Sequence, residues 1–230
     1  MIELSLVQKI IVCVPPILLA VTLHEVAHGW VAKINGDRTA ELMGRLSVNP
    51  IKHVDPVGTI LLPAFLAFTT GFIFGWAKPV PVSFNDLNSP KTDMAKVAIA
   101  GPASNMVMMI IWAVVLKMSI IAPNSSQWIT VPLIYMASVG VYINCIMMVL
   151  NLLPLPPLDG SRILAAYLPG PLDFKYMKLE RYGIFILLAL LVFTPLGGLM
   201  LSSVQSVVKL FSEFTGTDIN GVVQLLFSKK

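Results

Sequence analysis

Residues 10–32 place polar side chains inside an apolar run that is long enough to cross a membrane. A helix rises about 1.5 Å per residue, so this run covers the hydrocarbon core of a bilayer, roughly 30 Å thick. Within it, His24-Glu25-Val26-Ala27-His28 puts two histidines four residues apart, on one face of the helix. Ionisable groups in a membrane are costly and usually mark a site. The run therefore constrains the chain to a membrane fold that contains a polar site.

The composition extends this constraint to the whole chain. Of its 230 residues, 56% are hydrophobic and only 12% are charged, whereas an ordinary soluble domain has about 25% charged residues. The hydrophobic residues form five apolar blocks, at 10–32, 56–77, 97–116, about 128–153 and 182–208. No polar stretch between them reaches the size of a soluble domain, about 50 residues. We therefore expect a single integral membrane domain over residues 1–230 that binds no nucleic acid.

The Lys and Arg residues predict which blocks cross the membrane. Three loops, at 33–55, 78–96 and 154–181, hold eleven of the 16 basic residues. Positive residues gather on the cytoplasmic side, and these loops share one side only if block 56–77 enters the membrane and returns. We expect an all-α polytopic membrane protein with about four transmembrane helices and a re-entrant or hairpin block. A signal-peptide reading of the first block is rejected, because no A-x-A-like cleavage site precedes His24.

Two segments on the same side do not have a helical pattern. Apolar and more polar residues alternate at 42–48, which is a weak strand pattern. Pro79 and Pro81 favour an extended backbone at 79–83. We expect both segments to be small β elements near the cytoplasmic face. Near the C-terminus, residues 222–227 are typical of an amphipathic surface helix that is too short to span the membrane.

The histidine pair predicts a metal site that needs one more ligand. Catalytic zinc sites use three protein ligands and leave one position for water. Asp159 is the best candidate beside His24 and His28, because it follows an apolar block in a proline-rich segment that cannot form a regular helix. It reaches the histidines' side of the membrane only if block 56–77 does not cross. The alternative is that Asp159 caps the helix that begins at residue 160.

Neighbouring polar residues predict hydrolysis of a peptide bond. Glu25 is placed to take a proton from a metal-bound water and to pass it to the leaving amine. Asn151 is a candidate donor to the developing oxyanion or to the substrate backbone, although an interhelical hydrogen bond is a strong alternative. Asn105 is interpreted as a structural residue at a Gly-Pro kink. His53 is interpreted as a polar interfacial residue, with a role as ligand or gate as the alternative.

Two other classes of protein fit the same residues. One is a membrane metal-ion transporter, and the other is a non-catalytic zinc-binding membrane protein. A transporter would not need Glu25 as a base, and it would usually have polar groups on several crossing helices.

Three motifs together resemble the site-2 protease family of intramembrane zinc metalloproteases. They are His24 to His28, Ala100-Gly101-Pro102-Ala103-Ser104-Asn105, and the segment from Asn151 to Gly160. The flanking stretches 44–50, 55–59 and 75–82 are similar to a compact prokaryotic branch without PDZ or CBS domains. The resemblance covers roughly residues 15–165, and we expect a catalytic core at about 7–165 followed by a C-terminal helix and tail at 182–230.

The resemblance implies one Zn²⁺ per chain, held by His24, His28 and Asp159, with Glu25 as general base and Asn151 as an accessory group. It implies cleavage of transmembrane or membrane-proximal segments of membrane proteins, such as anti-sigma factors or signal-peptide remnants, in the cell membrane of a prokaryote. It also suggests that an extended segment near the site, 42–48 or 79–83, pairs with the unwound substrate as an added strand.

Overall fold

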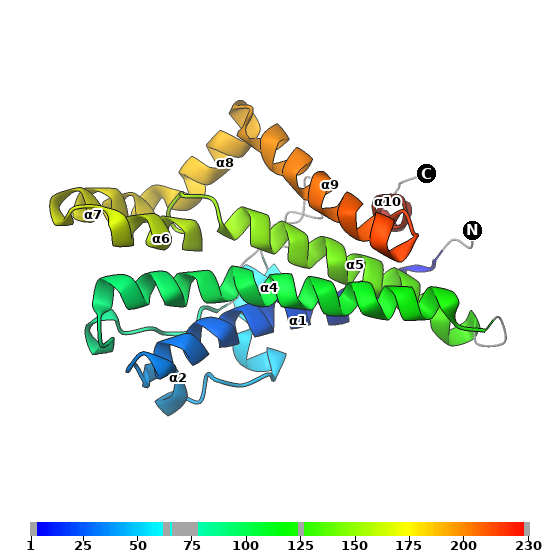
Figure 1. The fold of residues 1–230 in the computed structure, drawn as a ribbon, viewed down its shortest axis with the longest axis horizontal. Coiled ribbons are helices and arrows are strands. Elements are labelled where there is room, and N and C mark those ends of the chain that lie inside the picture. Colours follow the sequence, from blue (N-terminus) through cyan, green and yellow to red (C-terminus); the bar gives the residue numbers. More distant parts are fainter. Residues whose placement is uncertain (1–3, 62–64, 66–77, 124–126, 228–230) are drawn as a thin grey trace.

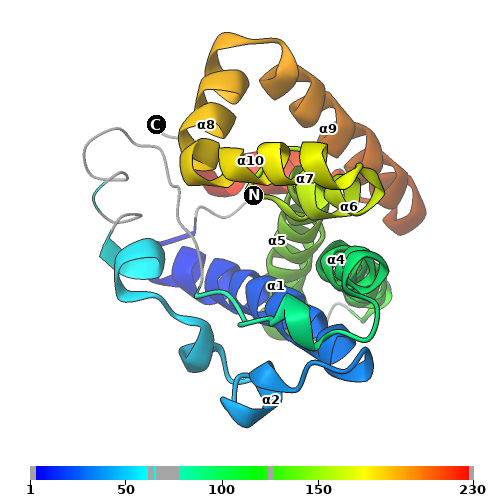
Figure 2. The same ribbon diagram turned by 90° about the vertical axis from the view of Figure 1, so that its left-hand side faces the viewer.

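Three long helices form the centre of the protein in a computed structural model that describes residues 4–61, 65, 78–123 and 127–227. They are α1 (Leu6–Ile34), α4 (Pro90–Ile121) and α5 (Gln127–Asn151). Among the described residues, these are the helices that are individually long and apolar enough to cross a membrane. They lie side by side along the long axis of the molecule (Figure 1), and Figure 2 shows the bundle from its end. Three of the four predicted crossing blocks are thus confirmed as helices.

The fourth predicted crossing block, 182–208, is bent. Helix α8 (Gly183–Phe193) and helix α9 (Leu196–Thr215) belong to a helical pair bent by 81°, and the bend forms the apex of Figure 1. Pro195 at the break has no N–H to continue the hydrogen bonds of α8. Since α8 alone covers only about 16 Å, this block crosses a membrane only if the bent pair acts as one span.

The other described elements are short. They are α2 (Thr39–Leu42), η1 (Pro50–His53), η2 (Pro56–Leu61), η3 (Phe84–Asp86), α6 (Asp159–Tyr167), α7 (Gly170–Met177), η5 (Lys178–Tyr182) and α10 (Ile219–Phe227).

The predicted small β elements are wrong, because the part of the chain that the structure describes contains no strand. Leu42 ends α2, and Gly44 follows in a turn with a φ of +64°. In residues 79–83, the prolines remove two backbone donors. The N–H groups of Val80 and Ser83 donate to the side chains of Glu25 and Asp37 rather than to a neighbouring strand.

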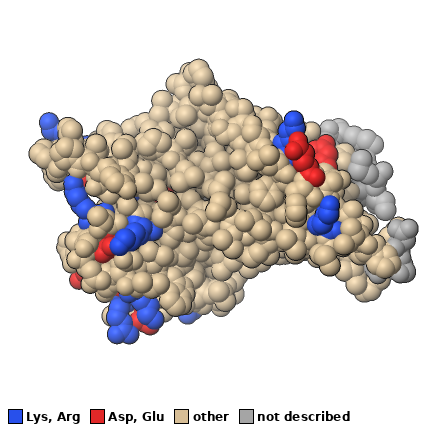
Figure 3. All heavy atoms as spheres, viewed as in Figure 1, with Lys and Arg blue, Asp and Glu red and all other residues tan. Residues whose placement is uncertain are grey.

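The three basic loops lie at the same end of the bundle, as predicted. Asn88 N donates to Asn35 O at 2.9 Å, and Lys91 Nζ donates to Leu168 O at 2.6 Å. Figure 3 shows charged side chains gathered at the two ends of one face, with a broad uncharged zone between them. The chain on either side of block 56–77 is therefore at one end of the bundle. Most of the block itself, including its predicted re-entrant turn, lies outside the described residues.

The core sits between α1, α4, α5, α9 and α10. Helices α4 and α5 approach closely where a Cβ at Gly140 would collide with the Trp112 ring. Helix α10 buries Ile219, Val223 and Leu226, which share one helical face because they are spaced by four and three residues. The predicted C-terminal helix is thus present, but its apolar face packs into the bundle.

Candidate metal centre

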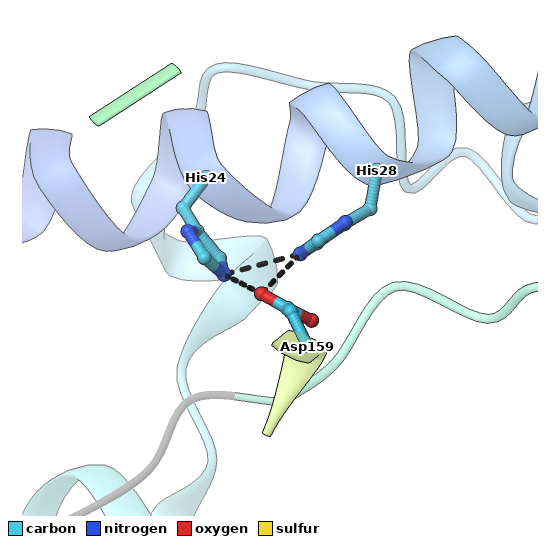
Figure 4. A group of neighbouring side chains, drawn as sticks. All are labelled: His24, His28 and Asp159. Atoms are coloured by element: carbon cyan, nitrogen blue, oxygen red, sulfur yellow. Dashed lines mark hydrogen bonds and ion pairs between the residues drawn. The ribbon is translucent and has the colours of Figure 1, made fainter. Parts of the chain in front are cut away.

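The two histidines of α1 face the first residue of α6. His24 Nε2 and His28 Nε2 each lie 3.3 Å from Asp159 Oδ2, and the two Nε2 atoms are 3.1 Å apart. Figure 4 shows the three side chains pointing toward one another from these two elements. Among the described residues, these three form a group that fits a metal ion. The structure therefore brings together the three residues that the sequence singled out as ligands.

The outer nitrogen of each histidine ring faces an oxygen. His28 Nδ1 lies 2.7 Å from Val97 O, and His24 Nδ1 lies 2.7 Å from Asn105 Oδ1. A carbonyl oxygen only accepts hydrogen bonds, so each Nδ1 donates and carries the ring proton. Each Nε2 then presents a lone pair to the other and to the carboxylate of Asp159. The two Nε2 atoms and Asp159 Oδ2 are thus three acceptors that face one another without a proton between the two nitrogens. A cation placed among them would stabilise this arrangement.

The spacing of these acceptors fits zinc. With bonds of about 2.0–2.1 Å, two ligands of a tetrahedral zinc site lie about 3.3 Å apart, and the three observed separations are 3.1, 3.3 and 3.3 Å. Asp159 Oδ2 is buried and has no hydrogen-bond partner among the described residues. Two imidazoles and one carboxylate are also a ligand set that catalytic zinc sites use.

Burial alone would raise the pKa of the Asp159 carboxyl group, but the two neighbouring histidines hold it well below its usual range. The alternative role as a helix cap is not observed, since Leu158 occupies the N-cap of α6 and no side-chain cap is present.

Gly101 of α4 leaves room for the histidine rings. A Cβ at this position would collide with His28 Nε2 and His24 Cε1. The Gly-Pro segment therefore has a specific role: glycine allows α4 to approach α1 at the site, and Asn105 one turn later supplies the acceptor for His24.

Glu25 is held by the extended segment 79–83. Its Oε2 accepts a hydrogen bond from Val80 N at 2.7 Å. Arg45 anchors the same segment, because its Nη2 donates to Lys78 O at 2.8 Å and to Pro79 O at 3.3 Å. The sequence analysis missed the role of Arg45. The signal that could have indicated it is the position of Arg45 in loop 33–55, which must pack near Pro79 and Pro81.

Asn151 and His53 are not joined to the three ligands. Asn151 ends α5, and its Nδ2 donates to Met147 O at 3.0 Å in its own helix. His53 is buried, with its Nε2 2.9 Å from Ser47 O.

Sequence analysis also missed Asn144 of α5. Its Oδ1 accepts from Asn105 Nδ2 at 2.9 Å, and both residues are fully buried. The signal was a carboxamide in an otherwise apolar block, which usually indicates a hydrogen bond between helices.

Comparison with known proteins identifies the family. The sequence model of peptidase family M50 matches residues 13–194. The chain belongs to this family. The protein named "Putative zinc metalloprotease YwhC" from Bacillus subtilis is 38% identical over 202 residues, which cover 85% of this chain and 89% of that protein. "Putative zinc metalloprotease Rip2" from Mycolicibacterium smegmatis is 26% identical over 195 residues, 84% of this chain and 70% of that protein. No solved structure matches the chain.

Family membership confirms the resemblance to site-2 proteases. The chain is therefore an intramembrane zinc metalloprotease that uses Zn²⁺ and acts on membrane proteins. The transporter and the non-catalytic protein that the sequence left as alternatives are not supported by these matches.

Proposed function

We propose that His24, His28 and Asp159 are the zinc ligands of this protease and that Glu25 is its general base. The convergence of two Nε2 atoms and one carboxylate oxygen at 3.1 to 3.3 Å carries this proposal. Zinc bound there would lower the pKa of a water molecule and polarise the scissile carbonyl. The residues of the chain then position the substrate and move the proton.

Glu25 moves the proton between water and the leaving group. The hydrogen bond from Val80 N holds Oε2, and a carboxylate has acceptor positions on both of its oxygens. Oε1 takes the proton from the attacking water and delivers it to the amine nitrogen of the cleaved peptide bond. Segment 79–83 thus fixes the direction of the catalytic carboxylate.

Asn151 is proposed to stabilise charge on the substrate. Its amide nitrogen has two hydrogens, and Met147 O uses one of them. The second is free to donate to the developing oxyanion or to the substrate backbone.

The proposed substrates are transmembrane or membrane-proximal segments, including those of anti-sigma factors and signal-peptide remnants, and the proposed location is the cell membrane.

Segment 79–83 is the candidate edge for an unwound substrate, since its backbone contacts Glu25. Val82→Pro removes a backbone donor from this edge. If the folded variant cleaves like wild type, this part of the proposal is wrong.

Residues 1–230 are proposed to act as one membrane domain, with a catalytic core at about 7–165.

The central experiment uses purified Glu25→Gln in detergent. Zinc content should equal that of wild type, while cleavage of a reporter transmembrane substrate should fall about 10²- to 10⁴-fold. Glu213→Gln makes the same chemical change on α9 and should leave both properties unchanged. Cleavage that persists in Glu25→Gln would overturn the assigned mechanism.

A further inference from the structure

A buried chain of hydrogen bonds connects His24 to the backbone of α5. His24 Nδ1 on α1 lies 2.7 Å from Asn105 Oδ1 on α4, and Asn105 Nδ2 donates to Asn144 Oδ1 on α5 at 2.9 Å. Asn144 Nδ2 then donates to Gly140 O at 2.8 Å. Both asparagines are 0% exposed, so their polar groups must find partners inside the protein.

The donor-to-acceptor direction of these hydrogen bonds is fixed by the backbone carbonyl of Gly140. Gly140 O can only accept, so Asn144 turns its nitrogen toward Gly140 and its oxygen toward Asn105. Asn105 must then turn its nitrogen toward Asn144, and Ala20 O at 3.3 Å is a second acceptor that favours the same orientation. The oxygen of Asn105 is left for His24.

The orientation of Asn105 decides which nitrogen of His24 carries the proton. A reversed amide would present N–H to Nδ1, and the ring proton would have to move to Nε2. Since a protonated nitrogen cannot bind a metal, the reversed amide would disable His24 as a ligand. His28 does not need such control, because its Nδ1 faces the backbone carbonyl of Val97, which cannot reverse.

We propose that Asn105 and Asn144 are positioning residues for the zinc site. Asn105 holds His24 in the tautomer with the proton on Nδ1, and Asn144 acts through Asn105 by preventing its amide from reversing. Neither residue touches the metal. The inference rests on the proposed function, in which His24 binds zinc through Nε2.

The first test separates the acceptor at position 105 from its packing. Asn105→Asp and Asn105→Leu both lose the donations to Ala20 and Asn144, so both zinc-free variants should unfold at a lower temperature than wild type. Only Asn105→Asp keeps an oxygen for His24. We expect Asn105→Leu to bind Zn²⁺ about 10- to 100-fold more weakly than wild type, whereas Asn105→Asp should bind as tightly as wild type or more tightly.

The measurements are a Zn²⁺ titration against a competing chelator, with purified full-length protein in detergent, and the visible spectrum of the Co²⁺ form. If Asn105→Leu matches wild type in Zn²⁺ affinity and in Co²⁺ spectrum, the proposal is wrong, whatever its unfolding temperature. If Asn105→Leu does not fold, the second test decides.

The second test places Asn144→Leu in two backgrounds. In wild type, the change frees the Asn105 amide to reverse, and Zn²⁺ affinity should fall by a smaller factor than in Asn105→Leu. In Asn105→Asp, both ends of side chain 105 are oxygens, so Asn144→Leu should have no effect on Zn²⁺ affinity. Ser138→Ala removes another fully buried polar group of α5 and should leave Zn²⁺ affinity unchanged in both backgrounds.

The double-mutant comparison measures whether the two positions are coupled. An equal loss of affinity in both backgrounds would show that Asn144 acts through helix packing, which would overturn its assigned role. Asp159→Ala distinguishes this failure from failure of the ligand set. If Asp159→Ala binds Zn²⁺ like wild type, the ligand set is wrong; if it loses Zn²⁺ while Asn105→Leu does not, only the positioning role is wrong.

Discussion

The two ends of the helical bundle are held together in different ways. At the end with α6 and α7, hydrogen bonds join side chains to segments far away in sequence, such as His28 to Val97 and Glu25 to Val80. At the other end, α9 and α10 pack on α5 through apolar residues, including Val208 and Ile219. Hydrogen bonds depend steeply on direction, whereas apolar contacts are individually small and additive.

This difference predicts which property each end controls. An open pocket of about 340 Å³ lies between α1, α5, α9 and α10, away from the three residues of the candidate metal centre. The polar end fixes the positions of the few atoms that are proposed to bind one metal ion. Substitutions at the polar end should therefore change zinc binding and cleavage, and substitutions at the apolar end should change stability.

The largest effect is expected for Asp159→Ala. Removing one of three ligands should abolish both zinc retention and cleavage, because two imidazoles alone do not complete a catalytic zinc site. Zinc content after dialysis and cleavage of a reporter substrate measure the two properties. Asp173→Ala, at an acidic residue in α7, should keep both. Full zinc content in Asp159→Ala would show that Asp159 is not a zinc ligand and that the polar end does not control zinc binding through it.

The next effect is expected for Gly101→Ala. The added Cβ collides with both histidine rings, so either the rings or α4 must shift. We expect weaker Zn²⁺ binding and a loss of cleavage of about 10²-fold, the cost of a displacement near 1 Å. Gly198→Ala meets nothing within 4 Å and should be silent. Wild-type zinc affinity in Gly101→Ala would mean that the polar end tolerates small displacements as well as the apolar end does.

A smaller effect is expected for Arg45→Met. The change keeps an unbranched stem but shortens the side chain and removes the donations to Lys78 O and Pro79 O. Segment 79–83 should then hold Glu25 less firmly, and cleavage should fall about 10-fold with zinc content unchanged. Arg38→Met, at an exposed arginine nearby, is the matched control. Loss of zinc together with cleavage would assign Arg45 to the fold rather than to Glu25.

The smallest effect on cleavage is expected for Ile219→Ala. Ile219 is fully buried in α10, and truncating a buried isoleucine costs about 2 kcal/mol or more of folding free energy. Cleavage at low temperature should match wild type, while thermal inactivation should occur earlier. Leu225→Ala, at an exposed position of the same helix, should change neither property. Loss of cleavage at low temperature would show that the apolar end also shapes the site.

Patterns in the amino-acid sequence are enough to predict the helical membrane fold and the three residues that form the candidate metal centre. The spacing of His24 and His28 fixes their common helical face, and the uneven distribution of basic residues brings Asp159 to the same end. Both are local or additive properties, so they can be derived without knowing how the helices pack.

Three features follow only from how the helices pack: the bend at Pro195, the absence of strands at 42–48 and 79–83 in the described chain, and the hydrogen bonds around the site. The sequence does not predict the contacts of Asn105 and Asn144, because a carboxamide in an apolar helix does not reveal its partner. That partner depends on the rotation and spacing of two neighbouring helices, which no local pattern encodes. The histidines of the motif are therefore visible in the sequence, while the oxygen atoms that orient them become visible only once the helices have packed.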